Sequence, residues 1–170
     1  QEYQSAWNAF SYDNVDLYYL DINKVSMVME ARTEGATTTY YVKIGPGDYS
    51  SYLSSTFANK KEIEDADVYI KDIRNQVMSI LGPYNNAMKI KVVNEWMIDN
   101  LSYENIEGNN NKYNLYGAIV ETKVVCEGYA RMFKYIMDGL NIPCILVSGT
   151  ATNSAFYRPV IWCGPAPAGT

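Results

Sequence analysis

The chain has 170 residues, of which 48% are hydrophobic and 14% aromatic, so it can bury one core and is not a disordered segment. Its net charge of -5 and its scattered 14 Lys and Arg leave no basic surface, which excludes nucleic acid as an expected partner. No apolar run approaches the roughly 18 residues of a membrane-spanning helix, so no membrane span is predicted.

Residues 1–60 are rich in Tyr, Ser and Thr, and they predict a short helix followed by strands. Helical structure is expected over residues 5–10 and a strand over residues 17–22. Apolar and polar residues alternate over 25–31, and β-forming residues dominate 37–44 after a Gly-containing turn, which predicts a β-hairpin. We therefore expect an N-terminal β-containing subdomain over residues 1–60.

Helical spacing replaces alternation from residue 62 onward. Apolar residues recur three or four positions apart over 62–82, where a Gly-Pro pair ends the pattern. A second helix is predicted over 86–101. A third, over 126–139, presents apolar side chains at the same spacing and closes at a glycine.

The segments between and after these helices are shorter. Residues 102–114 contain three consecutive Asn and predict a polar loop without periodicity. Residues 115–120 are apolar and predict either a helical turn or a buried strand, and residues 144–148 predict a short buried strand. We expect residues 61–153 to form the core of a partial domain and residues 154–170 to form an anomalous tail.

Cys126 stands where a loop enters the third predicted helix. The unpaired amides and the positive dipole end of a helix N-terminus favour a thiolate at such a position. The backbone N–H of the same residue also points toward the oxyanion that forms when a thiolate attacks an amide carbonyl. The alternative is that Cys126 is a small buried apolar residue, which is the commoner role of a helical cysteine.

The residues from Cys126 onward read Cys-Glu-Gly-Tyr-Ala and stand within the segment 116–130. This segment resembles the nucleophile segment of bacterial transglutaminase-like domains, which share the papain-type cysteine fold. Residues 95–103 are similar to the helix and Tyr-ended turn that precede it in that family, and residues 139–149 to the helix end and strand that follow it. The resemblance implies an α+β, papain-like domain with helices packed on an antiparallel sheet that is incomplete in this chain.

In this family the thiolate is paired with a His that an Asp orients, which is the logic of a catalytic triad. The resemblance implies acyl transfer of the transglutaminase or cysteine-protease type on protein or peptide amides, with cell-wall peptide as one candidate substrate. It also implies a secreted bacterial protein, extracellular or at the cell surface. No cofactor or metal is expected, whereas the choice among hydrolysis, deamidation and cross-linking stays open, as does the oligomeric state.

The chain contains no His. After Asn153, where the family continues toward its His and Asp, the segment 154–170 departs from the family pattern. We interpret it as a truncation or a change of reading frame that removes the later strands. Without an imidazole, no group takes the proton of the thiol or protonates the leaving amine, so we expect this chain to be inactive. The alternative is a non-catalytic cell-surface module that binds protein or carbohydrate and keeps the fold.

Two residues near Cys126, Tyr116 and Glu127, each have two interpretations, and the two other cysteines stand in different sequence contexts. Tyr116, ten residues before Cys126, is either a donor to the oxyanion or a Tyr packed in the core. Glu127 is either an orienting acid or, as we favour, an acidic residue that complements the helix dipole. Cys144 stands in an apolar strand context and is expected to be an inert core thiol, whereas Cys163 lies in the tail.

Overall fold

The computed structural model describes residues 2–46, 51–150 and 157–163, with the backbone alone for residues 2–4, 148–150 and 157–163. The chain divides into two compact units. The core unit consists of Gln1–Tyr18 and Glu64–Thr170, and the hairpin unit consists of Tyr19–Ile63.

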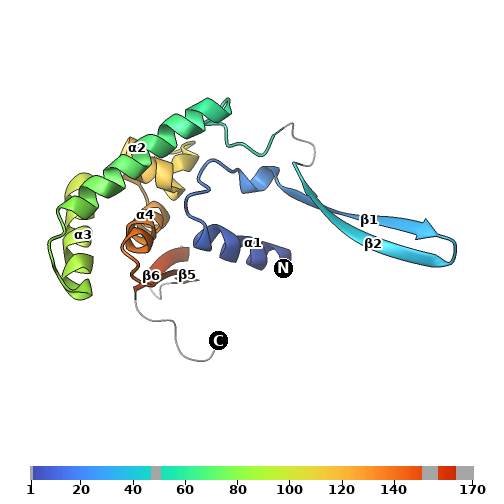
Figure 1. Ribbon diagram of the computed structural model, residues 1–170. Helices are drawn as coiled ribbons and strands as arrows, with labels where there is room; N and C mark the ends of the chain where they lie inside the picture. The colour runs from blue at the N-terminus through green and yellow to red at the C-terminus, as the bar shows by residue number, and fades with distance from the viewer. Residues whose placement is uncertain (1, 47–50, 151–156, 164–170) are drawn as a thin grey trace. The chain divides into compact units, whose positions relative to one another are not determined.

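The hairpin unit contains the predicted β-hairpin, which the structure confirms. Strand β1 (Ser26–Glu34) pairs antiparallel with β2 (Thr37–Gly45), in a register that runs from Ser26 opposite Gly45 to Glu34 opposite Thr37. Gly35 adopts a positive φ of 64° in the turn, a conformation that glycine reaches without steric cost. The two strands form the long ribbon in Figure 1.

The strand expected over residues 17–22 is wrong. Leu20 makes only an isolated antiparallel bridge with Leu53, and the chain then forms the 3-10 helix η1 (Ile22–Lys24). The carboxylate of Asp21 accepts a hydrogen bond from the Asn23 N–H at 3.0 Å and so begins the helix. Such local bonds from Asp to nearby amides compete with the ladder bonds of a strand.

The four predicted helices are all present as α1 (Glu2–Asp13), α2 (Lys60–Ser79), α3 (Asn86–Asn100) and α4 (Cys126–Gly139). Asn85 caps α3, because its side-chain oxygen accepts a hydrogen bond from the Met88 N–H at 2.9 Å. Among the described residues, none of the helices is long and apolar enough to cross a membrane.

Helix α4 is the centre of the core unit. It packs against α3 and against the sheet of β5 and β6, and Figure 1 shows it between these layers. The guanidinium of Arg74, on α2, lies 4.6 Å from the ring centroid of Tyr135 on α4. Burial of side chains such as Ile136 and Met137 stabilises the unit by roughly 1.5–3 kcal/mol each.

A two-stranded antiparallel sheet packs on α4. Strand β5 (Cys144–Thr150) confirms the predicted strand, and β6 (Tyr157–Cys163) pairs with it from Cys144 opposite Cys163 to Thr150 opposite Tyr157. We expected the strands after Asn153 to be missing, and the backbone of β6 shows that this expectation is wrong. Its run of Val, Ile and Trp favours extended structure, and the backbone of β5 provides the hydrogen-bonding partner.

Residues 1–18 belong to the core unit, although we expected them to group with the β-containing subdomain. Arg131 of α4 donates a hydrogen bond to the Ser11 carbonyl of α1 at 2.7 Å. The Tyr18 hydroxyl donates to the Asp67 carboxylate of α2 at 2.8 Å. These two long-range bonds tie residues 1–18 to the helices, which is why the division of the structure differs from a boundary at residue 60.

Candidate active site

Cys126 is the first residue of α4, as the sequence predicts. Its thiol is free and partly exposed, although the helix behind it is largely buried. The residue before it, Val125, is the N-cap and has an extended backbone with φ of -102° and ψ of -177°. The nucleophile candidate therefore lies at the leading end of the central helix and within reach of solvent.

The first turn of α4 has no side-chain cap. Val125, the N-cap, has no polar side-chain atom and makes no side-chain cap hydrogen bond, in contrast to Asn85 at the start of α3. The first N–H to bond within the helix is that of Tyr129, which donates to the Val125 carbonyl at 3.2 Å. Helix geometry leaves the amides of residues 126–128 without an intrahelical acceptor, so they can donate to the oxygen of a carbonyl attacked by Cys126.

The backbone just before Cys126 is irregular. Residues Gly117–Glu121 form the short π-helix η3, so the helical alternative for residues 115–120 is the correct one. Thr122 then adopts a left-handed conformation with φ of 56°, which is costly for a β-branched residue. Its carbonyl accepts a hydrogen bond from the Ser102 N–H at 2.8 Å, where β3 (Ser102–Tyr103) pairs in parallel with β4 (Lys123–Val124). A short π-helix and a non-glycine residue in a left-handed conformation are both typical of functional sites.

The Asn-rich segment before this π-helix is not the irregular loop that the sequence predicts, because hydrogen bonds of its Asn side chains, two of them to Glu121, order it. The Glu121 carboxylate accepts hydrogen bonds from the side-chain amides of Asn109 and Asn111, both at 2.6 Å. The side-chain oxygen of Asn114 accepts from the Gly117 N–H at 3.0 Å. The signal in the sequence was the Asn run itself, because Asn side chains form such turns with nearby backbone. These bonds connect the 3-10 helix η2 (Asn110–Tyr113) to η3.

Helix η2 fits directly against the first turn of α4. The Val125 N–H donates to the Lys112 carbonyl at 3.1 Å. The Gly128 of the Cys-Glu-Gly motif lies over the same carbonyl, and a Cβ at this position would come within 2.6 Å of the Lys112 oxygen. The motif therefore needs glycine at this position because the two backbones approach closely.

Tyr129 of the motif closes the other side of this turn. Its hydroxyl donates to the Leu101 carbonyl at the end of α3 at 2.9 Å, and its ring stacks on that of Tyr103 with centroids 6.3 Å apart. Burial raises the pKa of the Tyr129 phenol above its ordinary value of 10.0. The tyrosine therefore holds the nucleophile helix against the end of α3.

Replacement of Tyr129 by Phe is expected to lower the free energy of unfolding by about 1 kcal/mol, because the Leu101 carbonyl loses its donor. Since the pKa of Tyr129 is raised in the folded state, its contribution is present below pH 10.0 and is lost as the pH rises through the folded-state pKa. Urea denaturation at neutral and alkaline pH should therefore show a smaller alkaline loss of stability in Y129F than in the wild type. Tyr103→Phe, which keeps the ring pair, should stay within about 0.5 kcal/mol of the wild type at neutral pH.

The structure shows what surrounds the other residues that the sequence singles out near Cys126. The Tyr116 ring is half-buried and stacks on that of Tyr18 with centroids 6.0 Å apart, a packing contact that fits the core interpretation. Its role as an oxyanion donor stays a prediction. The Glu127 carboxylate is bonded by Arg131, and Cys144 is 5% exposed, which fits an inert core thiol.

The described part of the chain can provide a nucleophile and backbone donors but no imidazole, because the sequence contains no His. Within residues 2–46, 51–150 and 157–163, no group of three or more His, Cys, Asp or Glu side chains is placed to hold a metal ion. The arrangement can form a covalent bond from Cys126 to an electrophile. It lacks the His that carries out the proton transfers of a Cys-His-Asp triad.

Comparisons with known proteins bear on the fold. No family model matches the chain, and no curated protein matches it in sequence. Among solved structures it is similar to one described as the crystal structure of a TGase, with 13% sequence identity over 85% of this chain and a TM-score of 0.53. The chain covers 45% of the length of that protein. At this identity the likeness concerns the fold alone: this chain of mixed helices and strands has a fold similar to that of the TGase structure.

Proposed function

We propose that the complete domain catalyses acyl transfer on protein or peptide amides, in a papain-like arrangement with Cys126 as the nucleophile. The observation that supports this proposal most directly is the partly exposed thiol on the first residue of α4, before a turn that no side chain caps. The transglutaminase-like fold supports the same reaction class. The family resemblance extends the proposal to a secreted bacterial protein that acts on peptide at the cell surface.

The chemistry follows from the geometry of the first turn. The Cys126 sulfur attacks the amide carbonyl and forms a C–S bond, while the carbonyl oxygen takes up the electron pair and accepts hydrogen bonds from the open amides. Collapse to the thioester breaks the C–N bond and requires a proton for the leaving amine. Because this chain contains no His to deliver that proton, we propose that it reacts at Cys126 without turnover.

Alkylation of the native protein with iodoacetamide tests the nucleophile. Cys126 is expected to react at least about tenfold faster than Cys144, because the second thiol is buried. Trypsin cleaves after Lys123 and Arg131, so a peptide of residues 124–131 reports Cys126 alone. The variant Cys163→Ser leaves Cys144 as the only cysteine of the C-terminal peptide. Equal rates for the two thiols would contradict the proposal.

An amine-incorporation assay tests the absence of turnover. With a glutamine-containing protein and a fluorescent primary amine, the wild-type chain should give no more product than Cys126→Ala. Product that forms in the wild type and disappears in Cys126→Ala would show that another group replaces the imidazole.

A binding module is the second candidate function, and one feature of the hairpin unit favours it. Large apolar side chains of β1 and β2 are exposed although they stand in paired strands, with Met29 at 70%, Tyr40 at 67% and Val42 at 62%. Exposed apolar and aromatic surface of this kind is typical of interaction sites. A slow, unselective reaction of Cys126 would favour this alternative over the enzyme.

A further inference from the structure

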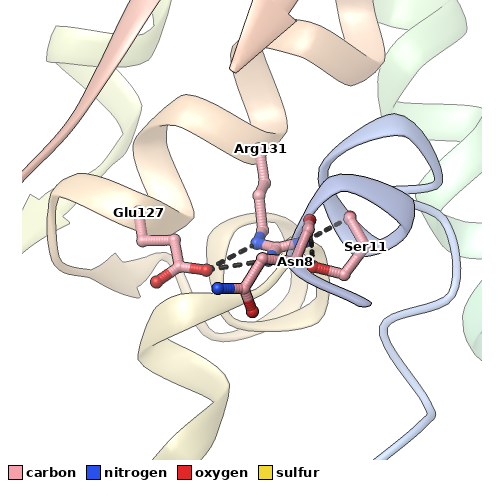
Figure 2. Close-up of polar contacts among 4 residues, drawn as sticks. All are labelled: Asn8, Ser11, Glu127 and Arg131. Atoms are coloured by element: carbon pink, nitrogen blue, oxygen red, sulfur yellow. Dashed lines mark hydrogen bonds and ion pairs between the residues drawn. The ribbon is translucent and has the colours of Figure 1, made fainter. Parts of the chain in front are cut away.

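The residue directly after the nucleophile is held by an arginine of the same helix. The Glu127 carboxylate oxygen Oε1 accepts hydrogen bonds from Nε of Arg131 at 3.0 Å and from Nη2 at 2.8 Å, and Figure 2 shows both bonds. The side chain of Glu127 is only 27% exposed and that of Arg131 only 13%. On α3, by contrast, the Lys91–Glu95 pair with the same spacing is 65% and 58% exposed, and such pairs contribute little.

Arg131 also connects this pair to the N-terminal helix. Its Nη1 donates to the Ser11 carbonyl at 2.7 Å, and Nη2 approaches the Ser11 hydroxyl at 3.2 Å. That hydroxyl in turn donates to the Asn8 carbonyl at 3.2 Å, and the guanidinium lies 5.2 Å from the ring centroid of Tyr12. The four residues of Figure 2 thus form one chain of polar contacts from α1 to the first turn of α4.

The other charged side chains of the segments around this turn are engaged elsewhere. Lys112 donates to the Ile106 carbonyl at 2.7 Å, and Lys123 pairs with Glu104 at 3.3 Å. Glu121 accepts from two Asn side chains. Arg131 is therefore the cation that neutralises Glu127, the carboxylate nearest in sequence to the nucleophile.

We propose that Arg131 is a positioning residue for Cys126. It fixes the Glu127 carboxylate against α1 and balances its negative charge in the first turn of α4, so an anionic reagent that approaches Cys126 meets no unpaired carboxylate there. Because α1 supplies two hydrogen-bond acceptors and one ring contact to Arg131, the N-terminal helix takes part in this positioning. The inference rests on the proposed role of Cys126 as the nucleophile.

Reaction of Cys126 with one neutral and one anionic reagent tests the proposal. Rates with iodoacetamide and with iodoacetate would be measured for the wild type, Arg131→Met, Glu127→Gln and the double variant. R131M leaves the Glu127 carboxylate unpaired, so we expect the rate with anionic iodoacetate to fall about threefold more than the rate with neutral iodoacetamide. E127Q should raise the ratio of the iodoacetate rate to the iodoacetamide rate, and the double variant should return it near the wild-type value.

Two further variants separate charge from structure. Arg131→Lys keeps the positive charge and should keep the wild-type ratio within about twofold. Asp138→Asn removes an acidic side chain at the other end of α4 and should leave both rates unchanged. A purely structural role of Arg131 would slow both reagents equally and leave the ratio constant, which would overturn the proposal.

The outcomes also distinguish this inference from the proposed function. If Cys126 of the wild type reacts no faster than Cys144, the nucleophile assignment fails and the positioning role fails with it. If the wild type is selective but the ratio is the same in all variants, only the positioning role is overturned. Should R131M unfold, Cys144 becomes reactive as well, and the ratio in E127Q then decides the question.

Discussion

Gly117→Ala is expected to lower the free energy of unfolding by about 3 kcal/mol or more. A Cβ at residue 117 would overlap the carbonyl oxygen of Asn111, a backbone atom of η2 that no side-chain rotation can move. Relief of this clash requires η2 and η3 to separate, which breaks the Asn114 bond to the Gly117 N–H. The substitution is therefore expected to unfold the Asn-rich segment even where the remainder of the core stays folded.

Urea denaturation followed by circular dichroism measures the effect, with Gly82→Ala as the matched control. A Cβ at residue 82 would meet only ring atoms of Tyr84, at 3.6 Å or more, which is ordinary contact. Gly82→Ala should therefore change the stability by less than about 0.5 kcal/mol. Equal stabilities of the two variants would show that η2 does not lie against Gly117.

Gly128→Ala is the second substitution with a large expected effect, because it places a methyl group at the nucleophile turn. The new Cβ would lie 2.6 Å from both the Lys112 carbonyl oxygen and Cγ1 of Val124. Overpacking of this kind costs about 1–3 kcal/mol, and here it also pushes η2 away from the start of α4. We therefore expect a loss of about 3 kcal/mol in stability together with a slower reaction of Cys126.

The control for Gly128→Ala is Gly139→Ala at the far end of the same helix. The nearest atoms there belong to the side chains of Arg74 and Met78, which can move aside, and the residue does not have a positive φ. Gly139→Ala should stay within about 1 kcal/mol of the wild type and leave the alkylation rate of Cys126 unchanged. A Gly128→Ala protein with wild-type stability and reactivity would contradict the close contact of η2 and α4.

The sequence predicted those elements whose signals are local. The three- and four-residue spacing of apolar side chains located α2, α3 and α4, and alternation around a Gly turn located the β1–β2 hairpin. The start of α4 at Cys126 was predicted in the same way. Each of these patterns records which side of a single element is buried, so it can be read without knowledge of its neighbours.

The sequence failed where a side-chain hydrogen bond or a distant partner decides the conformation. Residues 17–22 have strand-forming composition, but Asp21 begins a 3-10 helix instead. The Asn-rich segment was predicted as an irregular loop, because its order depends on the Glu121 carboxylate ten or more residues away. Strand β6 was not expected at all, since its backbone is organised by pairing with β5.

The sequence by itself determined which reactive groups are present. One of the three cysteines stands in a Cys-Glu-Gly-Tyr-Ala motif at a helix start, and the chain contains no histidine. Composition and motif need no coordinates, because they concern which atoms exist. The tertiary structure alone decided that Arg131 lies between Glu127 and α1, 120 residues away from Ser11 in the chain. It also decided that Gly117 and Gly128 lie against the same turn of η2. Contacts of this kind depend on the packing of whole elements, which no local pattern of side chains encodes.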